Sequence, residues 1–154
     1  MDINKYRLKG KTTYLIANSE NYCSTDNFLD AVAKELENGI EVVELRENCS
    51  AYKIIEHGKR IRELCSIYNA LFIVHDRLDV AKIVHADGIH LPVDGIDINT
   101  TKEFFEENII IGTSIEAQTE ILEKELEKYD YILCSKTTPN IAKIHTFSKI
   151  KKLI

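Results

Sequence analysis

The segment from Ile73 to Pro92 constrains the fold of this chain more than any other, because it holds two short apolar runs separated by a short helical pattern. It predicts a strand, a loop with Asp76 at the exit of that strand, a helix, and a second strand that ends near His90. Strand, helix and strand in this order are typical of parallel α/β folds. Such folds carry their functional side chains at the C-terminal ends of the strands. The sequence therefore predicts where the functional site lies before it predicts what the site does.

Short apolar runs typical of buried parallel strands recur along the whole chain. They predict six strands: Thr13–Ala17, Glu41–Glu47, Ala70–Asp76, Gly88–Leu91, Ile109–Ser114 and Tyr131–Cys134. Helical patterns lie between them at Phe28–Asn38, Ser50–Tyr68, Leu78–His85, Thr100–Glu107 and Glu116–Lys128. Gly39 is placed to end the first of these helices, and Asn99 or Thr100 to cap the fourth.

Regular alternation of strands and helices leaves two architectures, an open doubly wound sheet or a (β/α) barrel. No glycine-rich phosphate loop follows the first strand, although a nucleotide-binding open sheet would carry one there. Polar groups instead follow several strands in turn, as at a barrel mouth: Glu44, Arg46 and Asn48, then His75 and Asp76, Asp94, Ser114 and Lys143. We therefore expect residues 1–154 to form a single domain with a TIM-barrel-type (β/α) fold, incomplete because only about six of eight βα units are present.

Six parallel strands cannot close the usual eight-stranded barrel, so the first and last strands are expected to keep unpaired backbone groups. The tail carries Ile144, Phe147, Ile150 and Ile154 at helical spacing, which predicts an amphipathic helix with an apolar stripe. A homodimer is the simplest way to cover both features. The alternative is that the tail folds back over its own open edge.

Charge and composition exclude several classes of partner. The chain has 20 basic and 25 acidic residues, a net charge of −5, and no basic stripe interleaved with aromatic residues, so a nucleic acid is not expected. No apolar run approaches the ~20 residues that span a bilayer, and the start lacks the apolar core of a secretory signal, so no membrane is expected and the location is predicted to be cytoplasmic. The four cysteines are scattered without a Cys-x-x-Cys pair and are predicted to be reduced thiols.

The second predicted strand and its exit carry Glu44, Arg46 and Asn48 at a spacing of two residues, which places all three side chains on one face, toward the barrel mouth. There Arg46 could grip a phosphate with two hydrogen bonds. The alternative is a buried ion pair between Arg46 and Glu44 or Glu47.

Asp76 and Asp94 follow successive strands and could together hold Mg²⁺ against phosphate oxygens. The alternative for Asp76 is a cap on the helix that starts near Leu78. Of the histidines, His90 is expected to point into the barrel, whereas His57 is expected to lie solvated on its helix. No His, Asp and Glu group has the spacing of a closed zinc site.

Five segments together resemble the thiamine phosphate synthase/TenI family. They are Glu44-Leu-Arg-Glu-Asn48, His75-Asp-Arg-Leu-Asp-Val-Ala81, Ala86-Asp-Gly-Ile-His-Leu91, Gly112-Thr-Ser114 and Pro139-Asn-Ile-Ala-Lys143. The resemblance implies a (β/α)8 barrel and an enzyme of thiamine biosynthesis. That enzyme joins hydroxymethylpyrimidine diphosphate to a thiazole phosphate and releases pyrophosphate with the help of Mg²⁺.

By resemblance, each candidate residue has an expected role. Arg46 and Lys143 would hold the leaving pyrophosphate, Ser114 the pyrimidine, and Asp76 and Asp94 the metal ion. Glu44, Asn48, His75 and Asn140 occupy further substrate-binding positions of the family. The expected ligands are therefore small thiamine precursors, with Mg²⁺ as cofactor.

The sequence departs from the family pattern at several of these positions. The family's Gln-x-Arg-x-Lys is Glu44-x-Arg46-x-Asn48 here, its Asn-Asp is His75-Asp76, and its Thr-x-Thr-Lys is Asn140-Ile-Ala-Lys143. The glycine-rich turns that bind the thiazole phosphate have no counterpart, and TenI-type tautomerases carry a histidine where Glu116 stands. The sequence thus favours a synthase-like transferase, with a non-catalytic or TenI-like protein that binds a thiamine precursor or a protein partner as the alternative.

Overall fold

The computed structural model describes residues 2–106, 108–115, 123–134, 144–147 and 149–153. All strands in this part of the chain are parallel and form one sheet in the order β7-β6-β5-β4-β3-β2-β1-β8. The strands are β1 Thr13–Ala17, β2 Val42–Leu45, β3 Leu71–His75, β4 Gly88–Leu91, β5 Ile110–Ile115, β6 Tyr131–Cys134, β7 His145–Phe147 and β8 Lys149–Leu153. The helices are α1 Ile3–Leu8, α2 Thr25–Glu37, α3 Ala51–Ile67, α4 Leu78–Ile83, α5 Ile98–Phe104 and α6 Glu123–Leu126.

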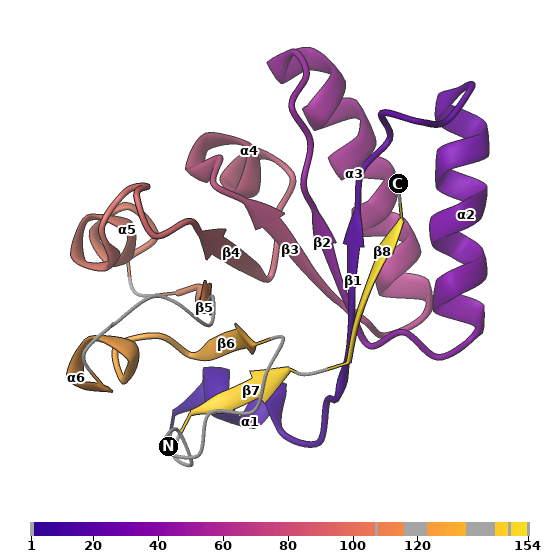
Figure 1. The fold of residues 1–154 in the computed structure, drawn as a ribbon. Coiled ribbons are helices and arrows are strands. Elements are labelled where there is room, and N and C mark those ends of the chain that lie inside the picture. The colour runs from indigo at the N-terminus through magenta and orange to yellow at the C-terminus, as the bar shows by residue number, and fades with distance from the viewer. Residues whose placement is uncertain (1, 107, 116–122, 135–143, 148, 154) are drawn as a thin grey trace.

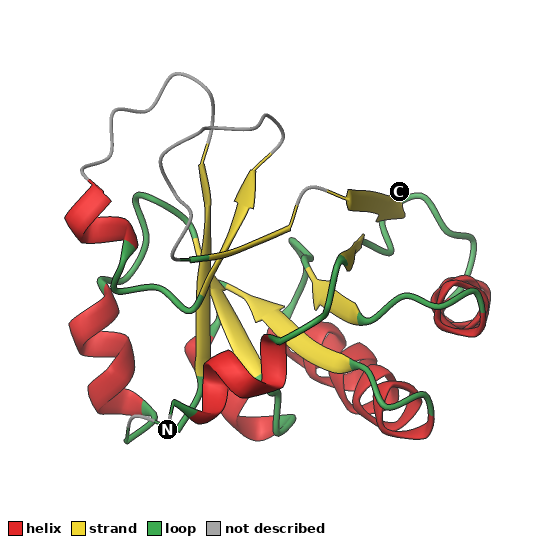
Figure 2. Ribbon diagram, turned by 90° about the horizontal axis from the view of Figure 1, so that it is seen from below, coloured by secondary structure: helices red, strands yellow, loops and turns green. Residues whose placement is uncertain are grey.

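The strands curl into a nearly closed barrel with helices α2 to α6 outside it (Figures 1 and 2). The prediction of a TIM-barrel-type fold is therefore confirmed, as are all six strands that the sequence indicated, with ends shifted by a few residues at most. No helix among the described residues is long and apolar enough to cross a membrane.

The C-terminal segment adds a strand at each edge of the sheet and brings the barrel near closure, and here the predicted tail helix is wrong. β7 pairs with β6, and β8, which begins two residues after β7 ends, pairs with β1 on the opposite side of the sheet (Figure 1). One stretch of chain thus satisfies the backbone groups of both edges that the sequence left open, which an amphipathic helix could not do. The spacing of three residues between Phe147 and Ile150 does not reflect a helix. Phe147 on β7 and Ile150 on β8 both pack into the interior core.

Two apolar cores lie on the two faces of the strands. Side chains that alternate along the strands fill the barrel interior: Tyr14, Ile16, Val42, Leu71, Ile73, Ile110, Tyr131, Leu133 and Phe147. The larger core lies between the strands and the surrounding helices and includes Leu15, Val43, Phe72 and Ile89 with Phe28, Val32 and Ile61. Because the side-chain period of a strand is two, Glu44 and His90 point into the barrel interior, on the same face as Val42 and Ile73.

The helix ends follow local rules, with two differences from the sequence prediction. Ser24 and Ser50 cap α2 and α3 through their hydroxyl oxygens, and Gly39 follows α2 with φ +101°. Asp97, not Asn99 or Thr100, caps α5 by accepting a hydrogen bond from the Thr100 amide. Helix α1, which the sequence did not indicate, places Leu8 fully buried in the interior core.

Gly112 on β5 permits a close approach of the Tyr131 ring inside the barrel. A Cβ atom at this position would lie 2.0 Å from Cζ and 2.1 Å from Cε1 of Tyr131, which is its register partner on β6. The Tyr131 ring therefore lies directly over a glycine. This contact fixes where the Tyr131 hydroxyl enters the polar site described next.

Candidate active site at the barrel mouth

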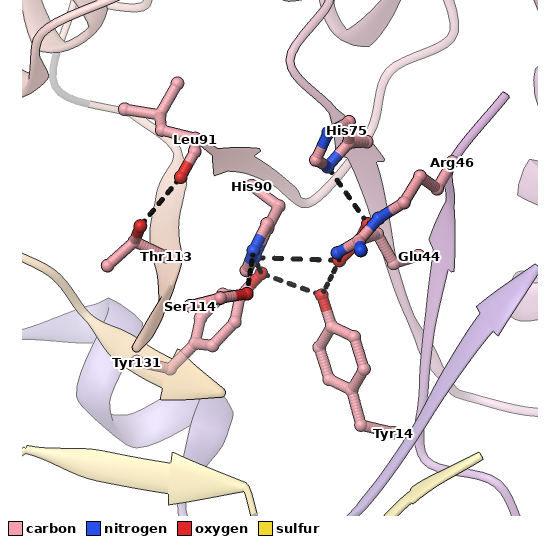
Figure 3. A network of polar contacts seen from close by, with 9 residues as sticks. All are labelled: Tyr14, Glu44, Arg46, His75, His90, Leu91, Thr113, Ser114 and Tyr131. Carbon is pink, nitrogen blue, oxygen red and sulfur yellow. Dashed lines mark hydrogen bonds and ion pairs between the residues drawn. The ribbon is translucent and has the colours of Figure 1, made fainter. Parts of the chain in front are cut away.

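Glu44 is the centre of the polar site, and its side chain is fully buried. Its Oε2 accepts a hydrogen bond from Arg46 Nε at 2.5 Å, and its Oε1 accepts bonds from Arg46 Nη2 at 3.1 Å and from the Tyr14 hydroxyl at 2.6 Å (Figure 3). Burial by itself raises the pKa of a carboxyl group, but His90, His75 and Arg46 outweigh it and hold the pKa of Glu44 well below its ordinary value. Glu44 is therefore an ionised acceptor.

Arg46 is held by this carboxylate through a bond from each of two guanidinium nitrogens. The structure thus shows the ion pair that the sequence left as the alternative to phosphate binding. The Arg46 side chain keeps 32% of its surface exposed, so its outer face is open to the mouth of the barrel. A phosphate that approached Arg46 would have to share the guanidinium with Glu44.

His75 and Asp76 end β3 at the same mouth. His75 Nδ1 is buried 3.2 Å from Glu44 Oε2, but it lies outside hydrogen-bonding geometry. Asp76 has φ +62° at the centre of a three-residue turn, in which the Arg77 amide donates to the His75 carbonyl. The Asp76 amide donates to the His90 carbonyl at 2.9 Å, and the helix cap at Arg77 has no side-chain hydrogen bond, so Asp76 does not cap α4.

His90 and Ser114 complete the cluster from β4 and β5. Ser114 Oγ lies 2.8 Å from His90 Nε2, and the hydroxyl oxygen of Tyr131 lies 3.0 Å from His90 Nδ1. The Tyr131 and Tyr14 hydroxyls are 2.9 Å apart. Burial lowers the pKa of His90 to about 4, against the opposing attraction of the Glu44 carboxylate, so His90 is neutral at pH 7. The prediction that His90 points into the barrel is confirmed.

Asp76 and Asp94 line one hollow of about 660 Å³, which is formed by the segments that follow β3 and β4 and is not lined by Glu44, His90 or Ser114. Asp79, Thr100 and Phe104 also line it, and Asp79 is paired with Arg77. A Cβ atom at Gly95 would lie 3.2 Å from an oxygen of Asp76, so the loop that carries Asp94 comes close to that carboxylate. Carboxylate oxygens are the ligands that Mg²⁺ prefers, so the donor set fits this ion.

Glu44, His75 and His90 form a second set of possible metal ligands. One ligand atom from each lies within 4.8 Å of the others. However, both Glu44 oxygens already accept bonds from Arg46 or Tyr14, and the guanidinium supplies the compensating positive charge. These three residues therefore fit an internal ion pair better than a bound cation.

Asn48 does not join the cluster. β2 ends at Leu45, so the two-residue period that places Glu44 inward does not extend to Asn48. Asn48 instead lines a smaller hollow of about 320 Å³ with Asn18, Ser19, Glu47 and Cys49. The expectation that Glu44, Arg46 and Asn48 share one face is wrong at its third member.

His57 is fully buried, and the expectation that it is solvated is wrong. Its Nδ1 lies 2.7 Å from Glu47 Oε2, and its Nε2 lies 3.0 Å from Thr25 Oγ1. Glu47 also accepts a hydrogen bond from the Ser19 amide at 3.0 Å. This network ties the loops after β1 and β2 to helices α2 and α3 and so supports the mouth.

Three residues singled out in the sequence, namely Asn140, Lys143 and Glu116, lie outside the described residues. Conversely, sequence reasoning missed Tyr14 and Tyr131. The available signal was their position in the strands: Tyr14 has the same parity as inward-facing Ile16, and an inward hydroxyl needs a polar partner.

Comparison with known proteins agrees with this geometry. The model of the family described as thiamine monophosphate synthase matches residues 13–150. The chain belongs to this family. A thiamine-phosphate synthase from Methanococcus maripaludis is 38% identical over 127 residues, which are 82% of this chain and 59% of the relative. One from Fusobacterium nucleatum is 29% identical over 152 residues, which are 96% of this chain and 73% of the relative.

Among solved structures, the thiamine phosphate pyrophosphorylase from Pyrococcus furiosus is similar with a TM-score of 0.70 and 31% identity. The match covers 91% of this chain and 66% of that one. This thiamine monophosphate synthase family member thus spans 59% of the length of the Methanococcus relative and two thirds of the solved structure.

Proposed function

We propose that this protein carries out a thiamine phosphate synthase-type transfer, in which hydroxymethylpyrimidine diphosphate and a thiazole phosphate are joined and pyrophosphate is released. The observation that carries the proposal is the convergence of Glu44, Arg46, His90 and Ser114 at one barrel mouth. Asp76 and Asp94 line a hollow formed by the segments after β3 and β4. These residues come from separate strands and the loops that follow them, in the place where barrels of this type build their sites.

The chemistry gives each group a task. Loss of pyrophosphate develops positive charge on the pyrimidine carbon and negative charge on the leaving oxygens. The exposed face of Arg46 would bind those oxygens, and the Glu44 carboxylate behind it would keep the guanidinium in place. Asp76 and Asp94 would hold Mg²⁺, which when bound supplies further positive charge to the diphosphate. Lys143 and Asn140 belong to the same proposal by family resemblance.

The test is direct. Purified protein is incubated with both substrates and Mg²⁺, and thiamine phosphate is measured by chromatography against a reaction without protein. We expect product with the natural chain and at least a tenfold loss in Asp76→Asn. Absence of product at high protein concentration would reject the transferase proposal.

A second candidate function is precursor binding without catalysis, and the pairing of Arg46 with Glu44 favours it. A carboxylate beside the guanidinium competes with a phosphate for the same hydrogen bonds. Restoring the family residues in a Glu44→Gln/His75→Asn variant should then strengthen diphosphate binding, measured by calorimetry. If the double variant gains product formation that the natural chain lacks, the natural chain is a binder.

The oligomeric state is part of the proposal as well. The sequence favours a homodimer because two sheet edges were expected to be open, but β7 and β8 now pair both of them. A dimer would have to use another surface, such as that around the exposed Tyr52 and Ile67.

The domain organisation is also a proposal. We propose that residues 1–154 form one domain without the last two βα units of the family barrel.

A further inference from the structure

Five side chains from five different strands form one continuous chain of polar contacts across the barrel (Figure 3). The chain runs from Ser114 to His90 at 2.8 Å, from His90 to Tyr131 at 3.0 Å, from Tyr131 to Tyr14 at 2.9 Å, and from Tyr14 to Glu44 at 2.6 Å. His90, Tyr131, Tyr14 and Glu44 are buried to 1% exposure or less. Only the Ser114 end is partly open to the mouth.

The hydrogen atoms in this chain can be placed by counting donors. An ionised carboxylate only accepts, so the single hydroxyl hydrogen of Tyr14 goes to Glu44. The contact between the two tyrosines then needs the hydrogen of Tyr131, which must point to Tyr14. The Tyr131 oxygen is left to accept, so His90 must carry its hydrogen on Nδ1.

The last link follows from the same count. A neutral imidazole has one N–H group, and in His90 that group is used at Nδ1, so Nε2 is an acceptor. Ser114 must therefore donate its hydroxyl hydrogen to His90 Nε2. Every hydrogen bond then points from Ser114 toward Glu44, and with Glu44 ionised and His90 neutral no other assignment fills all four contacts.

This placement of hydrogen atoms assumes an ionised Glu44, a neutral His90 and two protonated tyrosines, and the site supports each of these states. Glu44 is ionised because Arg46 donates two charge-assisted hydrogen bonds to its buried carboxylate. The His90 ring is only 1% exposed, and this burial disfavours the charged imidazolium, although the Glu44 carboxylate lies 3.6 Å from His90 Nδ1 and favours it. Burial also raises the pKa of both tyrosines, so their hydroxyl groups keep their hydrogens.

We propose that Glu44, Tyr14 and Tyr131 are positioning residues that fix His90 in its Nδ1–H form and thereby make Ser114 a pure hydrogen-bond acceptor toward the ligand. Ser114 has only lone pairs left to offer to the mouth, so it selects a ligand group that carries N–H or O–H and disfavours phosphate oxygen. The ligand part of the proposal rests on the proposed function, because it takes the barrel mouth as the substrate site. The hydrogen placement is independent of that function.

The first experiment measures the His90 tautomer without any ligand. Protein labelled with ¹⁵N-histidine is studied by long-range ¹H–¹⁵N NMR at pH 7, and the His90 signals are assigned by their loss in His90→Gln. We expect a single neutral tautomer with the hydrogen on Nδ1. An Nε2–H tautomer, or an imidazolium, in the natural chain would overturn the proposal.

The second experiment removes one hydrogen bond of this polar network, the bond between Tyr131 and Tyr14, without changing His90 itself. Tyr14→Phe keeps the ring but removes the hydroxyl that accepts from Tyr131, so the Tyr131 hydrogen is free to turn toward His90 Nδ1. We expect a shift of His90 toward the Nε2–H tautomer in this variant. The control is Tyr129→Phe, which removes a hydroxyl that is not part of the hydrogen-bond network and should leave the His90 signals unchanged. An unchanged tautomer in a folded Tyr14→Phe protein would show that Tyr14 does not set it.

The ligand side is tested with hydroxymethylpyrimidine, which carries an amino group, and with inorganic phosphate. Ser114→Ala should weaken binding of the first by about tenfold, the worth of one hydrogen bond, and leave phosphate binding unchanged. Equal loss for both probes would refute the acceptor role. If neither probe binds the natural chain, the proposed function and the ligand part of this proposal fail, while the tautomer result still decides the hydrogen placement.

Discussion

Gly112→Ala is expected to destabilise the protein severely, because it places a methyl group inside the Tyr131 ring. The new carbon would lie 2.0, 2.1 and 2.4 Å from three ring atoms, far inside van der Waals contact. The ring cannot yield easily, because Tyr14 and Phe147 pack against it with centroids 5.7 and 5.6 Å away and His90 lies at 5.8 Å.

The size of the loss can be worked from these contacts. Overpacking a tight core costs about 1–3 kcal/mol. Displacement of Tyr131 also breaks its hydrogen bonds to Tyr14 and His90, at about 1 kcal/mol each. Together we expect the free energy of unfolding to fall by about 3–5 kcal/mol, which lowers the melting midpoint by roughly 10 °C for a chain of this size.

Urea unfolding followed by circular dichroism measures this loss. Gly10→Ala is the matched control: its φ of +78° strains an alanine, but a Cβ there meets nothing within 4 Å, so the loss should stay near 1–2 kcal/mol. In a Tyr131→Leu background the cost of Gly112→Ala should shrink, since the ring is gone. A Gly112→Ala protein within about 1 kcal/mol of the natural chain would refute the reasoning.

Three further predictions follow from buried groups. Phe147→Ala should cost about 3–5 kcal/mol in urea unfolding, because Phe147 is fully buried in the barrel; a cost no larger than that of Lys152→Ala would mean that the segment does not close the barrel. The pKa of His90 is lowered to about 4 from an ordinary value near 6.5, so the unfolded chain takes up the proton first as pH falls. Stability should then drop by about 2 kcal/mol between pH 7 and pH 5, and His90→Gln should lose that part of the slope; an equal slope in both proteins would contradict this. Burial raises the pKa of the Cys65 thiol to about 12, so a thiol reagent at pH 8 should modify exposed Cys23 rapidly and Cys65 only on unfolding, and rapid native labelling of Cys65 would argue against its burial.

Much of the fold was readable from local sequence pattern. The six strands from Thr13 to Cys134 are short apolar runs in which the period of two also places Glu44 and His90 inward. The motif from His75 to Leu91 located the barrel mouth and indicated the family. These features are set by a residue and its near neighbours in the sequence, so periodicity and spacing suffice to find them.

Only the tertiary structure decided how the two edges of the sheet are paired and which side chains contact one another in the site. Segment 145–153 has helical spacing in sequence, yet it forms strands because β6 and β1 offer unpaired backbone groups on both sides. Tyr14 and Tyr131 meet across 117 residues of sequence, and their contact depends on the parallel register that sets Tyr131 over Gly112. Whether Arg46 faces a phosphate or Glu44 was likewise left open by sequence, because burial, which only the assembled barrel creates, determines how strongly the two charges hold each other.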